Sequence, residues 1–270
     1  MPTNITSIYR VINFIFYINS YKGIRTIDST WEKFKYEKKD DYDIYVKLIH
    51  KKKEKYGIEH YKIEKTDFFL FRYQDGLMLV DRKWEKVTII GINTEIVFAF
   101  LIQIFHTHAV RNHMIQVHSS LIEYKNNGIM FLGPSGIGKT TQAELWHQYL
   151  DALIINGDMV FVEDKGDEFI GWGTPWHGSS PYCENTSVPV KALVVLKQGQ
   201  ENRIRKLEGF EKVSEVSNNI IYPMWIEDGM DLCLETLDHL LTHVPVYELV
   251  NKADEDSVLM VKQVVFDEKN

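Results

Sequence analysis

The most constraining feature of this sequence is the stretch from Gly128 to Trp146, which reads GIMFLGPSGIGKTTQAELW. Its apolar run Ile129 to Leu132 is typical of a short buried strand. The next eight positions, Gly133 to Thr140, match the pattern G-x-x-x-x-G-K-[ST] at every fixed position. Thr141 to Leu150 then has the composition of a helix. A strand, a glycine loop and a helix in this order predict a phosphate-binding loop rather than a simple turn followed by a surface lysine.

Each part of this loop has a role in holding a triphosphate. Glycines let backbone N–H groups converge on a phosphate chain, and the start of the following helix adds partial positive charge. Lys139 can reach the β- and γ-phosphates, and the Thr140 hydroxyl can bind Mg²⁺. We therefore expect ATP or another nucleoside triphosphate, with Mg²⁺, as cofactors. The expected nucleotide contacts are Gly133, Pro134, Ser135, Gly136, Ile137, Gly138, Lys139, Thr140 and Thr141.

Composition excludes several function classes. The chain has 270 residues, 44% of them hydrophobic and 26% charged, which is ordinary for a soluble globular protein. Its net charge of -7 argues against nucleic-acid binding. The most apolar run, Ile96 to Phe105, is too short to cross a membrane, so no membrane partner is expected. Cys183 and Cys233 have no metal or redox spacing and fit a reducing cytoplasm.

The first part of the chain, residues 1–92, predicts a small antiparallel β domain. Its candidate strands are Ile8–Ile18, Tyr42–Ile49, Tyr61–Glu64, Phe68–Tyr73, Leu77–Val80 and Lys86–Ile90. Asp75-Gly76 between two of them is a strong hairpin signal. The basic run His50–Lys55 is either a solvated loop or a docking surface for an acidic peptide or protein.

Residues 93–270 predict a second domain in which strands alternate with helices around the glycine loop. A helix over Thr94–Asn112, capped by Asn93 or Thr94, leads into a strand over His113–Tyr124. Lys125–Gly128 then predicts a tight hairpin turn directly before the strand of the glycine loop. The later candidates are strands at Ala152–Asn156, Met159–Glu163, Glu168–Trp172, Pro189–Lys197, Arg203–Leu207 and Pro245–Val250, and helices at Phe210–Ile220, Asp231–Thr242 and Asp254–Val265.

Two residues outside the loop are candidates for chemistry. Phosphoryl transfer needs a carboxylate for the metal and a group that takes the acceptor's proton. Asp158 follows an apolar strand after the loop helix, where such a carboxylate belongs, although a strand-end aspartate can also be a turn residue. His118 lies in the strand before the glycine loop, where a histidine is either a satisfied structural residue or part of the site.

These segments together resemble a known family. Val117-His118-Ser119-Ser120, a hairpin, GPSGIGKTT, a helix and a strand ending in Gly157-Asp158 are similar to the nucleotide-binding core of the HPr kinase/phosphorylase and phosphoenolpyruvate carboxykinase superfamily. The resemblance implies an α/β (α+β) fold: a P-loop kinase core with a mixed sheet and flanking helices, beside the smaller antiparallel β domain. It implies Lys139, Asp158 and His118 as catalytic residues and Thr140 and Asp158 as metal ligands.

The chain departs from this family at one position. The family carries paired aspartates, thought to divide metal binding from acid–base work, whereas Asp158 stands alone between Gly157 and Met159. Asp158 then does one job, with the base supplied by His118, Glu163 or Glu184, or transfer is slow or lost. The loop Gly173–Pro181, with Trp176 and His177, is a candidate acceptor site or a structural loop, and Arg203 and Arg205 are candidate anion ligands or exposed strand residues.

Two functions follow as expectations. The first is an ATP-dependent kinase that transfers the γ-phosphoryl group to a hydroxyl, because some relatives in peptide-modification clusters phosphorylate a precursor peptide on serine. Its partner would be a peptide, a protein or a small polyol. The second is a nucleotide-gated binding module in which the β domain recognises a partner. The chain could also form a homo-oligomer.

Overall fold

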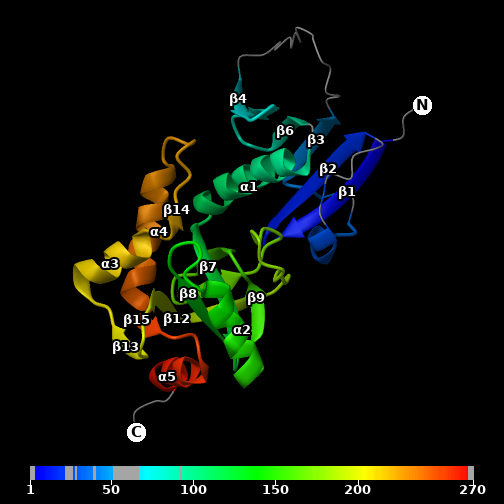
Figure 1. Ribbon diagram of the computed structural model, residues 1–270. Helices are drawn as coiled ribbons and strands as arrows, with labels where there is room; N and C mark the ends of the chain where they lie inside the picture. The colour runs from blue at the N-terminus through cyan, green and yellow to red at the C-terminus, as the bar shows by residue number, and fades with distance from the viewer. Residues whose placement is uncertain are drawn as a thin grey trace. The chain divides into compact units, whose positions relative to one another are not determined.

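A computed structural model describes residues 4–21, 27, 29–38, 41–50, 67–91 and 93–266. The chain forms two compact units, Met1–His108 and Ala109–Asn270, each with its own sheet (Figure 1). The division falls inside the helix α1 (Thr94–Arg111), whereas the sequence pattern placed it before that helix. Most of the basic run, Lys51–Lys55, and the predicted strand Tyr61–Glu64 lie outside the described residues.

The first unit is a six-stranded sheet with α1 packed on it. The strand order is β1-β2-β3-β6-β5-β4. Its elements are β1 (Asn4–Val11), β2 (Phe14–Tyr21), the 3-10 helix η1 (Ser29–Phe34), β3 (Ile44–His50), β4 (Phe68–Tyr73), β5 (Gly76–Asp81) and β6 (Lys86–Gly91). Phe105 of α1 meets Phe14 edge-on at 5.7 Å, and Phe98 stacks on Trp31. Apolar and aromatic packing therefore explains why this long apolar helix belongs to the first sheet.

The start of α1 follows the sequence prediction. The Ile96 N–H donates to Asn93 Oδ1 at 2.9 Å, so Asn93 is the N-cap. The helix then passes very close to the sheet, because a Cβ added at Gly76 would lie 2.2 Å from Ile96 Cγ2. The predicted hairpin between β4 and β5 is also present, with Tyr73 paired to Gly76.

Two predictions for the first unit are wrong. The sheet is mixed rather than antiparallel, because β3 pairs in parallel with both β2 and β6. The connections before and after β3 are long enough to return the chain to the same end of the sheet, and residue patterns do not report such crossovers. The predicted single strand Ile8–Ile18 is instead the hairpin β1–β2, which turns at Ile12 and Asn13. Ile12 takes a φ of 57°, which is unusual for a β-branched residue and gives no turn signal.

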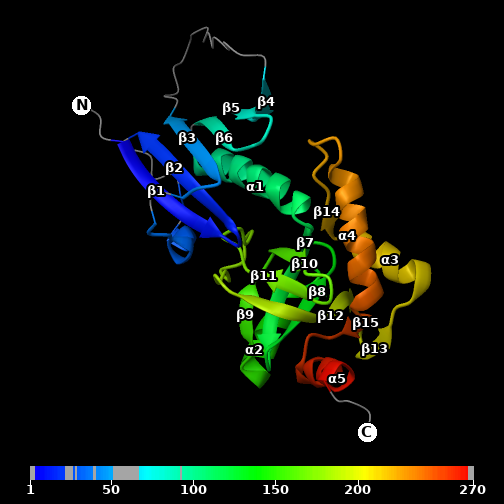
Figure 2. The same ribbon diagram turned by 180° about the vertical axis from the view of Figure 1, so that it is seen from behind.

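The second unit is a nine-stranded mixed sheet with helices on both faces (Figures 1 and 2). Its strands are β7 (Met114–Tyr124), β8 (Asn127–Leu132), β9 (Leu153–Asn156), β10 (Met159–Asp164), β11 (Phe169–Trp172), β12 (Ser187–Gln198), β13 (Arg203–Lys206), β14 (Ile220–Ile221) and β15 (Val246–Asn251). Its helices are α2 (Lys139–Leu150), α3 (Gly209–Ser217), α4 (Gly229–His243) and α5 (Glu255–Phe266).

Two hydrophobic clusters hold these helices to the sheet. β8, β12 and β15 are parallel neighbours, and such strands read as continuous apolar runs because both faces are buried. Met130 and Leu132 of β8 pack with residues of α3 and α4. Ile129 and Phe131 of the same strand pack with residues of α2 and α5. The strand of the glycine loop is therefore fixed from both sides.

Strand β7 pairs with four other strands of this unit. Its first half pairs with β10 and β14, and its second half pairs with β8 and β9. The predicted tight hairpin to β8 is confirmed: Lys125 and Asn126 both have positive φ, as a type I′ turn requires. His118 is the last residue paired to β10 and Ser119 the first paired to β8, so β7 changes partners beside His118.

The helix predicted over Phe210–Ile220 ends earlier. α3 stops at Ser217, and Ile220–Ile221 form β14 on the edge of β7. Helical periodicity extends into Ile220, but pairing with β7 satisfies its backbone and buries its side chain instead.

Candidate functional site

The glycine loop, residues 133–140, joins the end of β8 to the start of α2. Its three glycines, Gly133, Gly136 and Gly138, have φ values of 142°, 80° and 112°. Other residues adopt this region only under strain, so the glycines set the path of the loop. Ile137 N–H donates to the Pro134 carbonyl at 3.2 Å and tightens the turn between them.

The start of α2 is open to a ligand. Its N-cap, Gly138, supplies no side-chain hydrogen bond, and the first turn contains no acidic residue. The first N–H groups of a helix have no partner within the helix, and they carry the positive end of its dipole. This end of α2 is therefore suited to an anion.

Lys139 brings a cation to the same place. The side chain is almost buried, with 6% of the residue exposed, and Nζ donates to the carbonyls of Gly133 at 2.9 Å and Pro134 at 3.3 Å. Burial lowers the pKa of Lys139, and the nearby charge of Asp158 opposes that shift. An anion bound in front of the loop would compensate this desolvated charge.

His118 and Asp158 form a hydrogen-bonded pair. His118 Nε2 lies 2.9 Å from Asp158 Oδ1, and the two side chains are 30% and 25% exposed. Backbone bonds fix both residues: Ser119 N–H donates to the Asp158 carbonyl at 3.0 Å, and His118 N–H to the Asn219 carbonyl at 2.8 Å. The partner change in β7 therefore places an imidazole against a carboxylate.

One pocket of about 250 Å³ brings these groups together. Its lining is His118, Ser135, Gly136, Gly138, Lys139, Thr140, Thr141, Gly157, Asp158, Ser179 and Ser180. All three residues expected to be catalytic and both expected metal ligands are in this set. Gly133, Pro134 and Ile137 are not, because Gly133 and Pro134 present their carbonyls to Lys139 and Ile137 packs on the core below α2.

Asn156, which is not among the residues predicted from the sequence, builds the turn that carries Asp158. This buried side chain accepts hydrogen bonds from the N–H groups of Asp158 and Met159, both at 2.9 Å. Its Nδ2 donates to the carbonyls of Thr174 and Trp176, at 3.1 and 3.0 Å. An asparagine directly before Gly-Asp is a signal for such an Asx turn.

Asn219 connects the glycine loop to the strand of His118, and it was also not identified. Its Oδ1 accepts from Gly133 N–H at 2.9 Å, and its Nδ2 donates to the Glu215 carbonyl at 2.9 Å. The backbone carbonyl of Asn219 accepts a hydrogen bond from His118 N–H. No local pattern reports this contact, because Asn219 lies 86 residues from Gly133.

Of the three alternative bases, His118 lines the pocket, whereas Glu163 and Glu184 do not. Glu163 pairs with Met114 at the far end of β10 and accepts a hydrogen bond from Trp172 Nε1. Met114 lies four residue steps from His118, which is about 13 Å along a strand. Glu184 is not a lining residue either, and Asp158 is the one carboxylate among the residues that line this pocket.

Within the loop Gly173–Pro181 the pocket-lining residues differ from those predicted. Trp176 is buried beneath the loop, and His177 Nδ1 bonds to the Ser180 carbonyl. Ser179 and Ser180 line the pocket instead. The bulky residues thus shape the loop while small hydroxyl residues reach the site.

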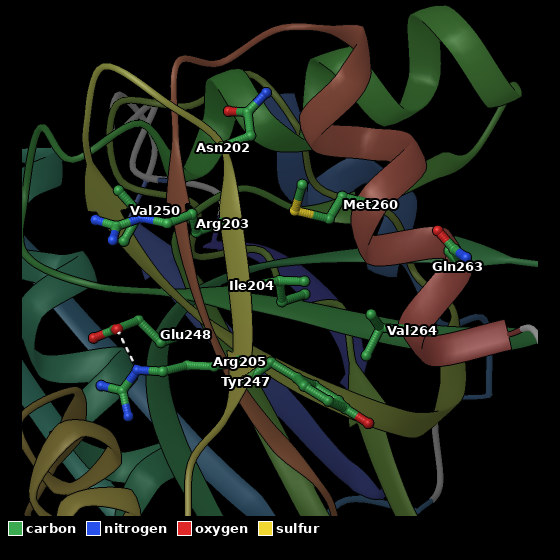
Figure 3. A pocket seen from close by; sticks show the side chains of 10 residues that line it. All are labelled: Asn202, Arg203, Ile204, Arg205, Tyr247, Glu248, Val250, Met260, Gln263 and Val264. Atoms are coloured by element: carbon green, nitrogen blue, oxygen red, sulfur yellow. Dashed lines mark hydrogen bonds and ion pairs between the residues drawn. The ribbon is translucent and has the colours of Figure 1, made fainter.

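Arg203 and Arg205 line a different, larger groove of about 1220 Å³ between β13, β15 and α5 (Figure 3). Arg205 Nε donates to Glu248 at 2.9 Å, and Arg205 Nη1 donates to Glu211 at 2.8 Å. Two carboxylates therefore already balance the charge of Arg205. This groove shares no lining residue with the pocket of the glycine loop.

The donor set of the pocket fits Mg²⁺ with a triphosphate. Thr140 and Asp158 offer oxygen atoms, which Mg²⁺ prefers. The described residues contain no group of three or more His, Cys, Asp or Glu side chains placed to hold a metal by themselves. Mg²⁺ commonly takes one or two protein oxygens and completes its shell with phosphate oxygens and water, so two ligands suffice.

Comparisons with known proteins find likeness only among solved structures. No family model matches the chain, and no curated protein matches it. Among solved structures, the HPr(Ser) kinase/phosphatase from Coxiella burnetii matches with a TM-score of 0.32 and 10% identity, covering 55% of this chain and 93% of that chain. In the part of the chain that the structure describes, no helix has the length and apolar character needed to cross a membrane.

Proposed function

We propose that this protein is a phosphotransferase that moves the γ-phosphoryl group of ATP, or another nucleoside triphosphate, to a hydroxyl group. The acceptor class we propose is a serine of a peptide or protein. The observation that carries this proposal is the His118–Asp158 pair facing Lys139 and Thr140 within one pocket. A nucleotide-binding loop alone would need no such pair.

In this proposal the chain supplies charge and position. The loop N–H groups and Lys139 bind the β- and γ-phosphates and stabilise charge on the transferring group. Mg²⁺ held by Thr140 and Asp158 would neutralise further phosphate charge. The acceptor hydroxyl loses its proton to the hydrogen-bonded His118–Asp158 pair.

A second candidate is a nucleotide-gated binding module with little transfer. It is favoured by the single carboxylate among the pocket-lining residues, because metal binding and proton acceptance then compete for Asp158. The two candidates differ in one measurable quantity, the amount of phosphate that reaches an acceptor. A small polyol as acceptor would belong to the first candidate.

The test is transfer of labelled phosphate from Mg²⁺-ATP to a panel of serine-containing peptides and polyols. Lys139→Ala and Asp158→Asn should each lower transfer about 100-fold or more, as loss of one transition-state contact does. Lys206→Ala and Asp167→Asn are matched controls at exposed positions outside the pocket. Tight nucleotide binding without transfer to any acceptor would favour the module, and normal ATP turnover by Lys139→Ala would refute both candidates.

A further inference from the structure

The loop from Gly173 to Pro181 is anchored to the strand end that carries Asp158. Asn156 Nδ2 holds two of its carbonyls, those of Thr174 and Trp176. Just after the loop, the Tyr182 carbonyl accepts from Gly157 N–H at 3.2 Å. These bonds hold both ends of the loop against the Gly157–Asp158 turn.

The middle of the loop lies directly on the Asp158 carboxylate. A Cβ added at Gly178 would fall 2.1 Å from Asp158 Oδ2, and one added at Gly157 would fall 1.8 Å from Ser180 Oγ. Only glycine allows an approach this close at either position. The next residue along the chain, Ser179, therefore lines the same pocket as Lys139 and Thr140.

We propose that Ser179 is a phosphorylation site within its own chain, modified by the pocket that it lines. This inference rests on the phosphotransferase function proposed above. The Ser179 hydroxyl oxygen forms a bond to the γ-phosphorus of the triphosphate. The bond from that phosphorus to the β,γ-bridging oxygen breaks, and the diphosphate leaves with the electron pair. The hydroxyl proton passes to the His118–Asp158 pair.

Ser179 fits this role better than its neighbour. Ser179 is exposed, whereas Ser180 is buried, with its Oγ accepting from Tyr182 N–H at 3.3 Å. The Ser180 side chain also fills the space above Gly157. A phosphoryl group on Ser180 would have to displace this packing, while one on Ser179 extends into the pocket.

The modification would limit itself. A phosphoserine carries about -1.5 to -2 charges at neutral pH. At residue 179 this charge would lie beside Asp158 and occupy the pocket that receives the triphosphate. Each chain should therefore take up one phosphate at this loop and then bind nucleotide more weakly than before.

The experiment is incubation of the full chain with Mg²⁺-ATP, followed by intact mass measurement and peptide mapping. We expect one phosphate at Ser179 in the unchanged protein and none there in Ser179→Ala or Lys139→Ala. Ser214→Ala, at an exposed serine on α3 outside the pocket, is the matched control and should be modified normally. The rate per chain should not depend on protein concentration, because the acceptor is in the same chain.

Nucleotide binding and diphosphate release are measured in the same samples. Phosphate transfer to an added acceptor with no phosphate at residue 179 would overturn this inference and leave the proposed function standing. Modification at Ser180, or a rate that rises with protein concentration, would overturn it as well. Absence of nucleotide binding and of diphosphate release would overturn the proposed function, and the inference with it.

Discussion

Replacement of Asn219 tests whether the glycine loop is held by the segment between α3 and β14. Asn219 is buried, and its side chain makes two hydrogen bonds of 2.9 Å, to Gly133 N–H and to the Glu215 carbonyl. In Asn219→Ala both bonds are lost, and the buried Gly133 N–H is left without a partner. A lost bond costs about 1 kcal/mol, and an unsatisfied buried donor about 1–3 kcal/mol.

The free energy of unfolding should therefore fall by about 2–4 kcal/mol, taking the two effects together. For a unit of this size, the midpoint of thermal unfolding should drop by about 5–15 °C. Circular dichroism during heating measures the change, and nucleotide titration of the folded variant measures the loop. Nucleotide affinity should fall too, because Gly133 starts the loop and loses the bond that holds its N–H. The bond from His118 N–H to the backbone carbonyl of residue 219 is kept in this variant.

The control is Asn218→Ala, one residue earlier, where the side chain is exposed. It should unfold within about 0.5 kcal/mol of the unchanged protein, as most surface substitutions do. The contrary result is that Asn219→Ala matches Asn218→Ala in both stability and nucleotide affinity. The contact between Asn219 and Gly133 would then contribute to neither property, and the proposed support of the glycine loop by Asn219 would be refuted.

Three further predictions concern the pocket. Gly178→Ala should lower phosphate transfer at least tenfold, because its Cβ would overlap the Asp158 carboxylate; Gly166→Ala has a similar positive φ with no atom within 4 Å and is the control for backbone strain alone. Asn156→Ala should destabilise the protein by about 2–4 kcal/mol in urea unfolding, since it removes the partner of two N–H groups and of the buried Thr174 carbonyl, while the Trp176 carbonyl keeps the Thr174 hydroxyl; an effect no larger than that of Asn218→Ala would contradict its role. Lys139→Met should abolish nucleotide binding yet keep or raise stability at pH 7, because burial lowers the pKa of Lys139 in the folded state. The unfolded chain holds that proton up to its usual pKa near 10.5, so the unchanged protein should gain stability as pH rises towards that value, and Lys139→Met should lose this gain.

Much of the second unit could be predicted from local patterns. The glycine loop, its strand and its helix follow from one contiguous motif. The hairpin turn before it was expected over Lys125–Gly128 and lies at Lys125 and Asn126. Of the two N-caps expected for α1, Asn93 is confirmed, since its side chain accepts from the N–H three residues later, and Asp254 does the same at the start of α5. Local hydrogen bonds of this kind are encoded within a few residues, which is why sequence reasoning finds them.

The first sheet was harder to predict from the sequence. The wrong predictions there concern how strands pair and where they turn, and not whether strands are present. A strand such as β3 looks the same from its residues whether its neighbours run parallel or antiparallel. The direction depends on where long connections return the chain, and that is decided by packing. The turn at Ile12 was missed for a related reason, because a β-branched residue at positive φ is tolerated only where the surrounding hairpin holds it.

The candidate site depends both on local sequence patterns and on strand pairing. His118 and Asp158 were each uncertain as single residues, because a strand histidine and a strand-end aspartate have common structural roles. What gives them meaning is the change of partners in β7, which brings His118 to the end of β10 and within hydrogen-bond distance of Asp158. The same part of β7 also pairs with β14 and donates His118 N–H to the Asn219 carbonyl, both far along the chain from the glycine loop. The chemistry of the pocket therefore depends on two features. The glycine-loop motif can be recognised in the sequence, whereas the change of partners in β7 cannot. Substitution of Asn219 tests the side-chain bond to Gly133 N–H, which ties the glycine loop to the segment that borders β7.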